Sequence, residues 1–153
     1  MVEFNPALQS RRQGLSWDKE AKPRVSEIRE DLKTAGYPMS NKELFMLFLG
    51  IGWKHQLNPG VPSRTTDSAR LSELTAQDFG LFNAIAMSHT GSFEVLSSRD
   101  AVLDIVEGFA AGGLRKAAEI LDTSQSLITA LRTDFWPVIN KWEPSEITPT
   151  EEN

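Results

Sequence analysis

The stretch at residues 44–53, LFMLFLGIGW, constrains the fold most, because it is apolar on almost every side. In a helix, one apolar stripe would pass through Leu44, Phe48 and Ile51, and further apolar residues would cover the remaining faces. A surface helix keeps one polar face, so this helix must be enclosed by neighbouring helices or by a second copy of the chain. It is too short for a membrane span, which needs about 20 apolar residues.

An apolar helix of this kind is also a candidate for protein association. We expect it to contact a larger protein partner, with a homodimer as the alternative. The association surface predicted on it consists of Leu44, Phe45, Phe48, Leu49 and Trp53.

The rest of the chain reads as helices separated by turn signals. Ser40 with Glu43, and Thr75 with Asp78, have the spacing of capping boxes, and Gly91 follows the second of these helices as a stop. We expect an all-α fold, a compact bundle of about five helices, with a single domain over residues 22–138. Residues 1–21 are predicted to be a flexible polar arm, and residues 139–153 a disordered acidic tail.

Two adjacent glycines interrupt a helical pattern at residues 107–121, EGFAAGGLRKAAEIL. Glycine inside a helix costs about 1 kcal/mol relative to alanine, so the pair needs a reason. Either Gly112 ends one helix in a left-handed cap, or the small residues form a notch where a second helix crosses a continuous one. Cap glycines are common, so we favour the break, a structural turn at Gly112, Gly113 and Leu114. A phosphate-binding loop is disfavoured, because no strand precedes the turn and the P-loop lysine spacing is absent.

A family resemblance rests on this stretch. The segment DAVLDIVEGFAAGGLRKAAEIL resembles the carboxy-terminal signature of small accessory proteins of DNA phosphorothioation (Dnd) systems, and the order of the upstream segments IGWKHQ and FGLFNAIAMSHTG is similar. The resemblance covers residues 23–122. It implies a bacterial accessory protein that works beside DNA-modifying and phage-defence machinery, and it supplies no catalytic residue.

Net charge argues against DNA binding by the whole surface, because the chain carries −5 and phosphate contacts require cations. Nucleic acid is therefore expected to be a secondary partner, contacted through its backbone. The cations predicted to touch phosphate are Arg11, Arg12, Lys22, Arg24, Lys54, Arg64, Arg70, Arg115 and Lys116.

Two other nucleic-acid roles remain open. The first two predicted helices have the order of a ribbon–helix–helix regulator, in which the second helices pair between subunits, although no alternating strand precedes them. The second of these roles is that of a small helical subunit of a nucleoprotein effector, such as a CRISPR surveillance complex.

Catalytic and metal-binding signatures are weak. The chain has no cysteine, and its two histidines, His55 and His89, stand at predicted helix ends without ligand-like neighbours. Asp100, Asp104 and Glu107 are interpreted as a solvated helix face. We therefore expect a non-enzymatic protein without metal or cofactor. No apolar run near the amino terminus resembles a signal peptide, which favours a cytoplasmic location.

Overall fold

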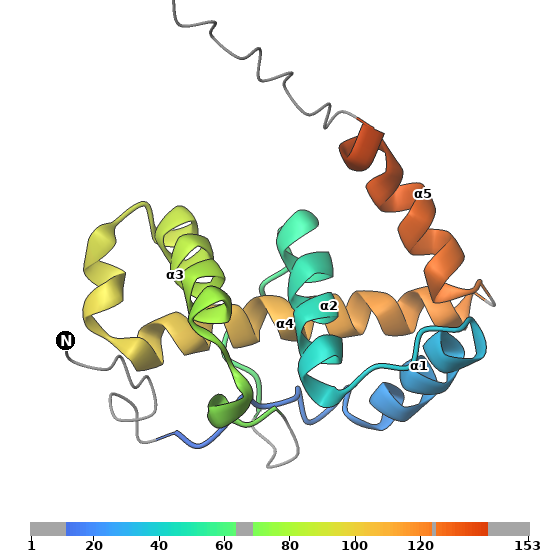
Figure 1. The fold of residues 1–153 in the computed structure, drawn as a ribbon, viewed down its shortest axis with the longest axis horizontal. Coiled ribbons are helices and arrows are strands. Elements are labelled where there is room, and N and C mark those ends of the chain that lie inside the picture. The colour runs from blue at the N-terminus through green and yellow to red at the C-terminus, as the bar shows by residue number, and fades with distance from the viewer. Residues whose placement is uncertain (1–11, 64–68, 124, 141–153) are drawn as a thin grey trace, which may run out of the picture.

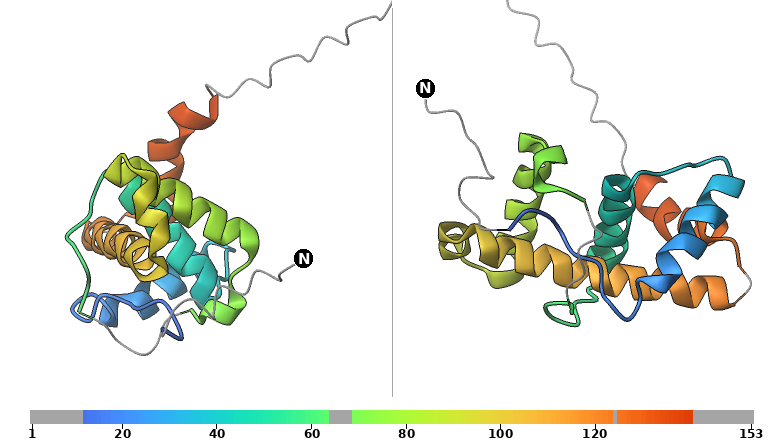
Figure 2. Two further views of the ribbon diagram at one scale, coloured as in Figure 1. Left: turned by 90° about the vertical axis from the view of Figure 1, so that its left-hand side faces the viewer. Right: turned by 90° about the horizontal axis from the view of Figure 1, so that it is seen from below.

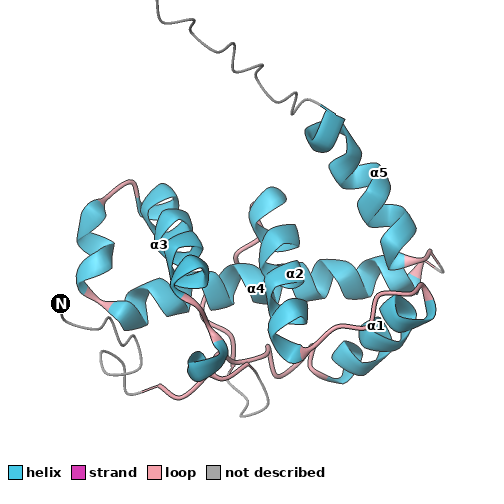
Figure 3. Cartoon of the chain, viewed as in Figure 1, coloured by secondary structure: helices cyan, strands magenta, loops and turns pink. Residues whose placement is uncertain are grey.

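The computed structural model describes residues 12–63, 69–123 and 125–140. Within these ranges the chain forms five α-helices and two short 3₁₀ helices, and no strand (Figures 1 and 3). The predicted all-α bundle of about five helices is thus confirmed. In chain order the elements are α1 (Pro23–Thr34), α2 (Asn41–Lys54), η2 (Leu71–Glu73), α3 (Ala76–Thr90), η3 (Phe93–Ser97), α4 (Arg99–Asp122) and α5 (Leu127–Asn140).

Local capping signals place the starts of α2 and α3 as predicted. The Ser40 hydroxyl accepts a hydrogen bond from the Glu43 backbone N–H, and the Glu43 carboxylate accepts one from the Ser40 N–H at 2.7 Å. Thr75 and Asp78 form the same reciprocal pair. Each box satisfies backbone N–H groups that a helix start leaves without an internal partner.

Asp78→Asn is expected to lower the free energy of unfolding by about 1 kcal/mol at pH 7. Burial alone would raise the pKa of Asp78, but bonds from Lys42 and Thr75 bring that pKa below its usual value. The stabilisation is therefore complete above about pH 4 and is lost as the pH falls through the lower folded-state pKa. Urea unfolding at several pH values should show the difference between wild type and variant shrinking below about pH 4. Glu30→Gln is the exposed control, and a difference equally large at low pH would exclude the carboxylate charge as its cause.

α4 is one continuous helix of 24 residues, and α2 crosses it steeply at the glycine pair (Figure 1). A Cβ on Gly113 would lie less than 3.0 Å from the Phe48 carbonyl oxygen and 2.9 Å from the Gly52 nitrogen. A Cβ on Gly52 would likewise meet the Phe109 carbonyl oxygen. Each glycine therefore faces the carbonyl of a phenylalanine on the other helix, so that only hydrogen fits between the backbones.

The predicted turn at Gly112, Gly113 and Leu114 is wrong, because all three lie buried inside α4. The alternative of a notch is the one that the structure shows. Glycine lets the backbones of α2 and α4 approach closely. The packing gained at this crossing stabilises the fold by more than the low helix propensity of glycine costs.

The chain leaving α2 also runs against α4. A Cβ on Gly112 would collide with the Leu57 carbonyl, and one on Gly108 would collide with the Asn58 side chain. Gly108 and Gly112 are four residues apart and share one face of the helix. α4 thus offers α2 and the segment after it a face that lacks side chains.

The apolar helix α2 is enclosed by its own chain. Phe45 is 1% exposed, and its ring lies 6.3 Å from that of Phe82 in α3. The ring of Phe48 lies 5.7 Å from that of Trp17, which precedes α1. Enclosure by neighbouring helices, one of the two arrangements expected from the sequence, is therefore correct.

The association surface predicted on α2 is wrong for the same reason. Leu44, Phe45, Phe48 and Leu49 are buried in the core, and Trp53 is partly buried with its ring 5.1 Å from that of Phe109. These side chains already contact other parts of the same chain, so a second protein cannot reach the buried four without unfolding the domain.

Residues 12–21 belong to the domain, which corrects the prediction of a polar arm over residues 1–21. Leu15 and Trp17 are buried in the core, and the Leu15 N–H donates to the Ala69 carbonyl at 2.9 Å. Figure 2 shows this segment running along α4. Two apolar anchors within a polar sequence were sufficient to bury it. Residues 1–11 lie outside the described part of the chain.

α5 leaves the far end of α4 and contacts α1 and α4 (Figure 1). Its first residue, Leu127, is buried, and Leu131 and Phe135 pack partly against the core. The sequence predicted an end at Pro137, but the helix continues to Asn140. Proline removes one backbone hydrogen bond, and here that loss falls in the final turn. Within the described residues no helix combines the length and apolarity needed to cross a membrane. Of the predicted acidic tail, residues 141–153 lie outside the described ranges.

Candidate functional site

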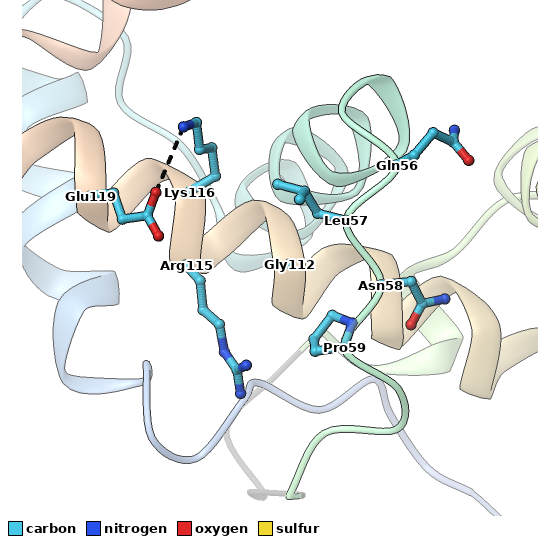
Figure 4. Close-up of a pocket in the computed structure, with 8 residues that line it drawn as sticks. All are labelled: Gln56, Leu57, Asn58, Pro59, Gly112, Arg115, Lys116 and Glu119. Carbon is cyan, nitrogen blue, oxygen red and sulfur yellow. Dashed lines mark ion pairs between the residues drawn. The ribbon is translucent and has the colours of Figure 1, made fainter.

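A pocket of about 420 Å³ opens between residues 56–59 and the middle of α4 (Figure 4). The segment after α2 supplies Leu57 and Pro59 as an apolar wall, together with the amides of Gln56 and Asn58. The wall formed by α4 carries Gly112, Arg115, Lys116 and Glu119. Both cations beside the glycine pair, which were selected from the sequence, therefore line one pocket.

The end of α2 gives this pocket its shape. The Leu57 N–H donates to the Gly52 carbonyl at 2.8 Å and the Gln56 N–H to the Trp53 carbonyl at 3.1 Å, the two bonds of a Schellman motif. Gln56 takes the left-handed conformation that such a cap requires, with φ of 53°. Its side-chain amide donates to the Trp53 carbonyl as well, at 2.6 Å. This turn directs Leu57 and Asn58 onto α4.

Arg115 is fixed at one side of the pocket by the segment before α1. Its Nε donates to Asp18 Oδ2 at 2.7 Å, and the Asp18 side chain is buried. Lys116 leaves α4 on the opposite side of the pocket (Figure 4). Its Nζ lies 3.6 Å from the Glu119 carboxylate, and the side chains of Lys116 and Glu119 are 40% and 68% exposed. The pocket therefore has a rigid cation at one rim and a loosely paired one at the other.

Three of the other predicted phosphate contacts form ion pairs inside the chain. The pairs join Arg12 to Asp104 and Glu107, Arg24 to Glu27 and Asp122, and Lys54 to Asp134. Lys22 directly precedes α1, and Arg70 is exposed and forms an isolated bridge with Gly14. Arg11 and Arg64 lie outside the described residues. Among the predicted cations that the structure describes, Arg115 and Lys116 come together in one pocket.

The pairs at the surface shift the pKa values of their members. The hydrogen bond to Asp122, followed by that to Glu27, raises the pKa of Arg24, and Arg24 in turn lowers the pKa of Asp122. Burial would raise the pKa of Asp134, but hydrogen bonds from Lys54 and His55 lower it overall. These carboxylates stay charged and keep their cations occupied, which weakens the case for phosphate contact at Arg24 and Lys54.

One acidic residue behaves differently from its sequence interpretation. Asp100 is exposed, but Glu107 is 0% exposed, so it is not part of a solvated face. Its carboxylate pairs with Arg12 and accepts the Ser16 N–H at 3.1 Å. The segment before α1 covers this position and brings the cation with it, an arrangement that helix periodicity cannot reveal.

The histidines lie at helix ends, as predicted. His55 caps α2 and its Nε2 is 2.6 Å from Asp134 Oδ2, while His89, in the last turn of α3, places its ring 5.2 Å from that of Phe109. No group of three or more potential ligands (His, Cys, Asp or Glu) is arranged to hold a metal ion within the described ranges.

No motif in the sequence of η3, FEVLS, singles it out. Phe93 is 80% exposed and Leu96 is 39% exposed, whereas Val95 packs partly against the core. In a 3₁₀ helix, residues three apart lie above one another, so Phe93 and Leu96 share the outer face. Beside them is a hollow of about 310 Å³, lined by Phe93, Met87, Ser88, Gly91 and Ser92. We call Phe93, Leu96 and this hollow the η3 surface.

Comparison with protein-family models, with curated proteins and with solved structures finds no match to this chain.

Proposed function

We propose that the protein is a non-catalytic adaptor that binds a larger protein partner through the η3 surface. The observation that carries the proposal is the exposure of Phe93. Burying a phenylalanine side chain stabilises a complex by roughly 1.5–3 kcal/mol, so a ring left in water is a strong potential anchor. The neighbouring hollow offers space for a side chain from the partner.

The η3 surface is held rigidly, which favours a binding role. Gly91 ends α3 in the left-handed conformation, and the Ser92 hydroxyl accepts the Glu94 N–H at 3.1 Å at the start of η3. These two consecutive caps fix the backbone from which the Phe93 side chain projects. A preorganised anchor loses less conformational entropy on binding than a mobile one.

The setting that we propose is a bacterial DNA-modification or phage-defence system in the cytoplasm, on the basis of the resemblance of residues 23–122 to Dnd accessory proteins. DNA contact is secondary in this proposal, since the net charge is −5 and Arg12, Arg24 and Lys54 are paired within the chain. The ribbon–helix–helix alternative has less support, because α2 packs on α4 of its own chain rather than on a second α2. A subunit of a nucleoprotein effector would use the same adaptor mechanism.

Phe93→Ser is expected to weaken partner binding by about 10- to 100-fold while leaving the domain folded. The measurement is co-purification and titration with the products of neighbouring genes. Tyr37→Ser is the matched control, since it removes another exposed aromatic ring near the end of α1, at the other end of the molecule (Figure 1).

A salt titration with random duplex DNA separates the adaptor from a regulator. The adaptor should bind DNA weakly at every salt concentration, whereas a regulator would show affinity that falls steeply with salt. Tight, salt-dependent DNA binding unaffected by Phe93→Ser, with no protein complex formed, would contradict the adaptor proposal.

A further inference from the structure

The pocket beside Gly112 has the size and lining of a small-molecule site. Its volume of about 420 Å³ falls within the range of roughly 300–1,000 Å³ that such sites occupy. An apolar wall of Leu57 and Pro59 faces polar and charged groups on α4. This combination lets a ligand bury carbon atoms on one side and place charges on the other.

We propose that this pocket binds a small organic or inorganic dianion, with one anionic group on Arg115 and the other on Lys116. The proposal is independent of the adaptor function, because the η3 surface shares no residue with the pocket. Carboxylate and phosphate groups can both accept hydrogen bonds from these two cations. A titration with one ligand of each kind distinguishes them.

Arg115 supplies the stronger of the two contacts. Because Asp18 binds Nε, both terminal nitrogens of the guanidinium can donate to one anionic group in a forked arrangement. The Asp18 side chain is buried and holds the arginine in place, whereas the arginine side chain is 46% exposed. A ligand therefore meets a cation that is already oriented.

Lys116 supplies the second contact from the opposite rim. Its separation of 3.6 Å from Glu119 and the exposure of both side chains make this an ion pair of low strength. An incoming anion can replace Glu119 at little cost. Figure 4 shows the Arg115 and Lys116 side chains leaving α4 in opposite directions, so Lys116 must turn toward the pocket before one small ligand can touch both cations, and its weak pair with Glu119 leaves it free to do so.

Close backbone packing forms the floor of the pocket. Gly112 lines it without a side chain and lies against Leu57, so that a Cβ there would collide with the Leu57 carbonyl. The α2 cap that positions Leu57 also brings the Asn58 amide to the rim, where its oxygen accepts the Gly60 N–H at 2.9 Å. The pocket is thus a product of rigid elements and not of a mobile loop.

The test is an NMR titration of the full ¹⁵N-labelled chain with succinate and with pyrophosphate at about pH 6, where both are mainly dianions, using acetate as the singly charged reference. Succinate or pyrophosphate should give saturable shifts at the amides of residues 56–59 and 112–116 below about 10 mM, with acetate about 10-fold weaker. Saturation by succinate only identifies a carboxylate ligand, and saturation by pyrophosphate only identifies a phosphate ligand.

Variants locate the binding. Lys116→Gln should weaken the dianion about 10-fold, as expected for the loss of one charge-assisted contact, and Lys33→Gln on the exposed end of α1 should not. Arg115→Gln should have at least as large an effect. Arg115→Gln also breaks the bond to Asp18, so its melting curve is recorded. If Arg115→Gln does not fold, the result with Lys116→Gln decides whether the proposal stands. No saturable shifts with either dianion, equal affinity for acetate, or unchanged affinity in Lys116→Gln would overturn the proposal.

Discussion

Gly113→Ala is expected to lower the free energy of unfolding by about 3 kcal/mol or more, which corresponds to a fall in melting temperature of roughly 10 °C. The added methyl group would lie less than 3.0 Å from the Phe48 carbonyl oxygen, an atom that cannot rotate away. Relief requires α2 and α4 to separate, and these two helices make the most extensive contact in the domain. A domain of this size has a total stability of only about 5–15 kcal/mol.

Gly50→Ala is the matched control, because Gly50 lies in the same helix α2 and a Cβ there meets nothing within 4 Å. This substitution should raise stability by roughly 0.5–1 kcal/mol, since alanine is the better helix former. Gly52→Ala should behave like Gly113→Ala, because it collides with the Phe109 carbonyl. Urea unfolding followed by circular dichroism measures all three. If Gly113→Ala unfolds at the same midpoint as wild type, the close crossing of the two helices is refuted.

Features determined by neighbouring residues could be predicted from the sequence. The capping boxes at Ser40 and Thr75 and the left-handed stop at Gly91 each involve residues within four positions of one another. The enclosure of α2 followed from its composition, because a helix that is apolar on nearly every side cannot face water. Periodicity and capping therefore sufficed for the fold class and for most helix boundaries.

The glycine pair could not be interpreted from its own segment. A cap glycine and a packing glycine look identical in sequence, and the difference lies in Phe48 and Gly52, more than 50 residues away. One signal was present, since Phe-x-x-x-Gly occurs both at residues 48–52 and at residues 109–113. Helical spacing places each phenylalanine carbonyl on the face of its glycine, and the repetition indicates two faces that can meet.

The candidate site was only partly predictable for the same physical reason. Arg115 and Lys116 were identified as neighbours of the glycines, but the opposite wall comes from residues 56–59, which a tertiary contact brings there. The pairing of Arg12 with Glu107 spans 95 positions and has no periodic signature. Cations that the sequence marks as available are therefore occupied in the folded chain.

Arg12→Met is expected to destabilise the domain by about 3 kcal/mol, because it removes a cation paired with a carboxylate that has no contact with water. Glu107 is fully buried and Arg12 nearly so, and the pair holds the segment before α1 against α4. Urea unfolding at pH 7 measures the loss. Arg24→Met is the control: Arg24 also binds two acids, but Glu27 and Asp122 are exposed to water, and the loss should be much smaller.

The Arg12→Met/Glu107→Gln double variant tests whether charge is the cause. Glutamine keeps an oxygen that can accept the Ser16 N–H and removes the buried charge. The double variant should therefore be more stable than Arg12→Met by about 1 kcal/mol or more, since a buried polar group costs less than a buried ion without its partner. The single variants Arg12→Met and Glu107→Gln are measured as well. If their losses in the free energy of unfolding add up to the loss in the double variant, Arg12 and Glu107 are not energetically coupled. Equal losses in Arg12→Met and Arg24→Met would show that burial of the Arg12 pair contributes nothing to anchoring the segment.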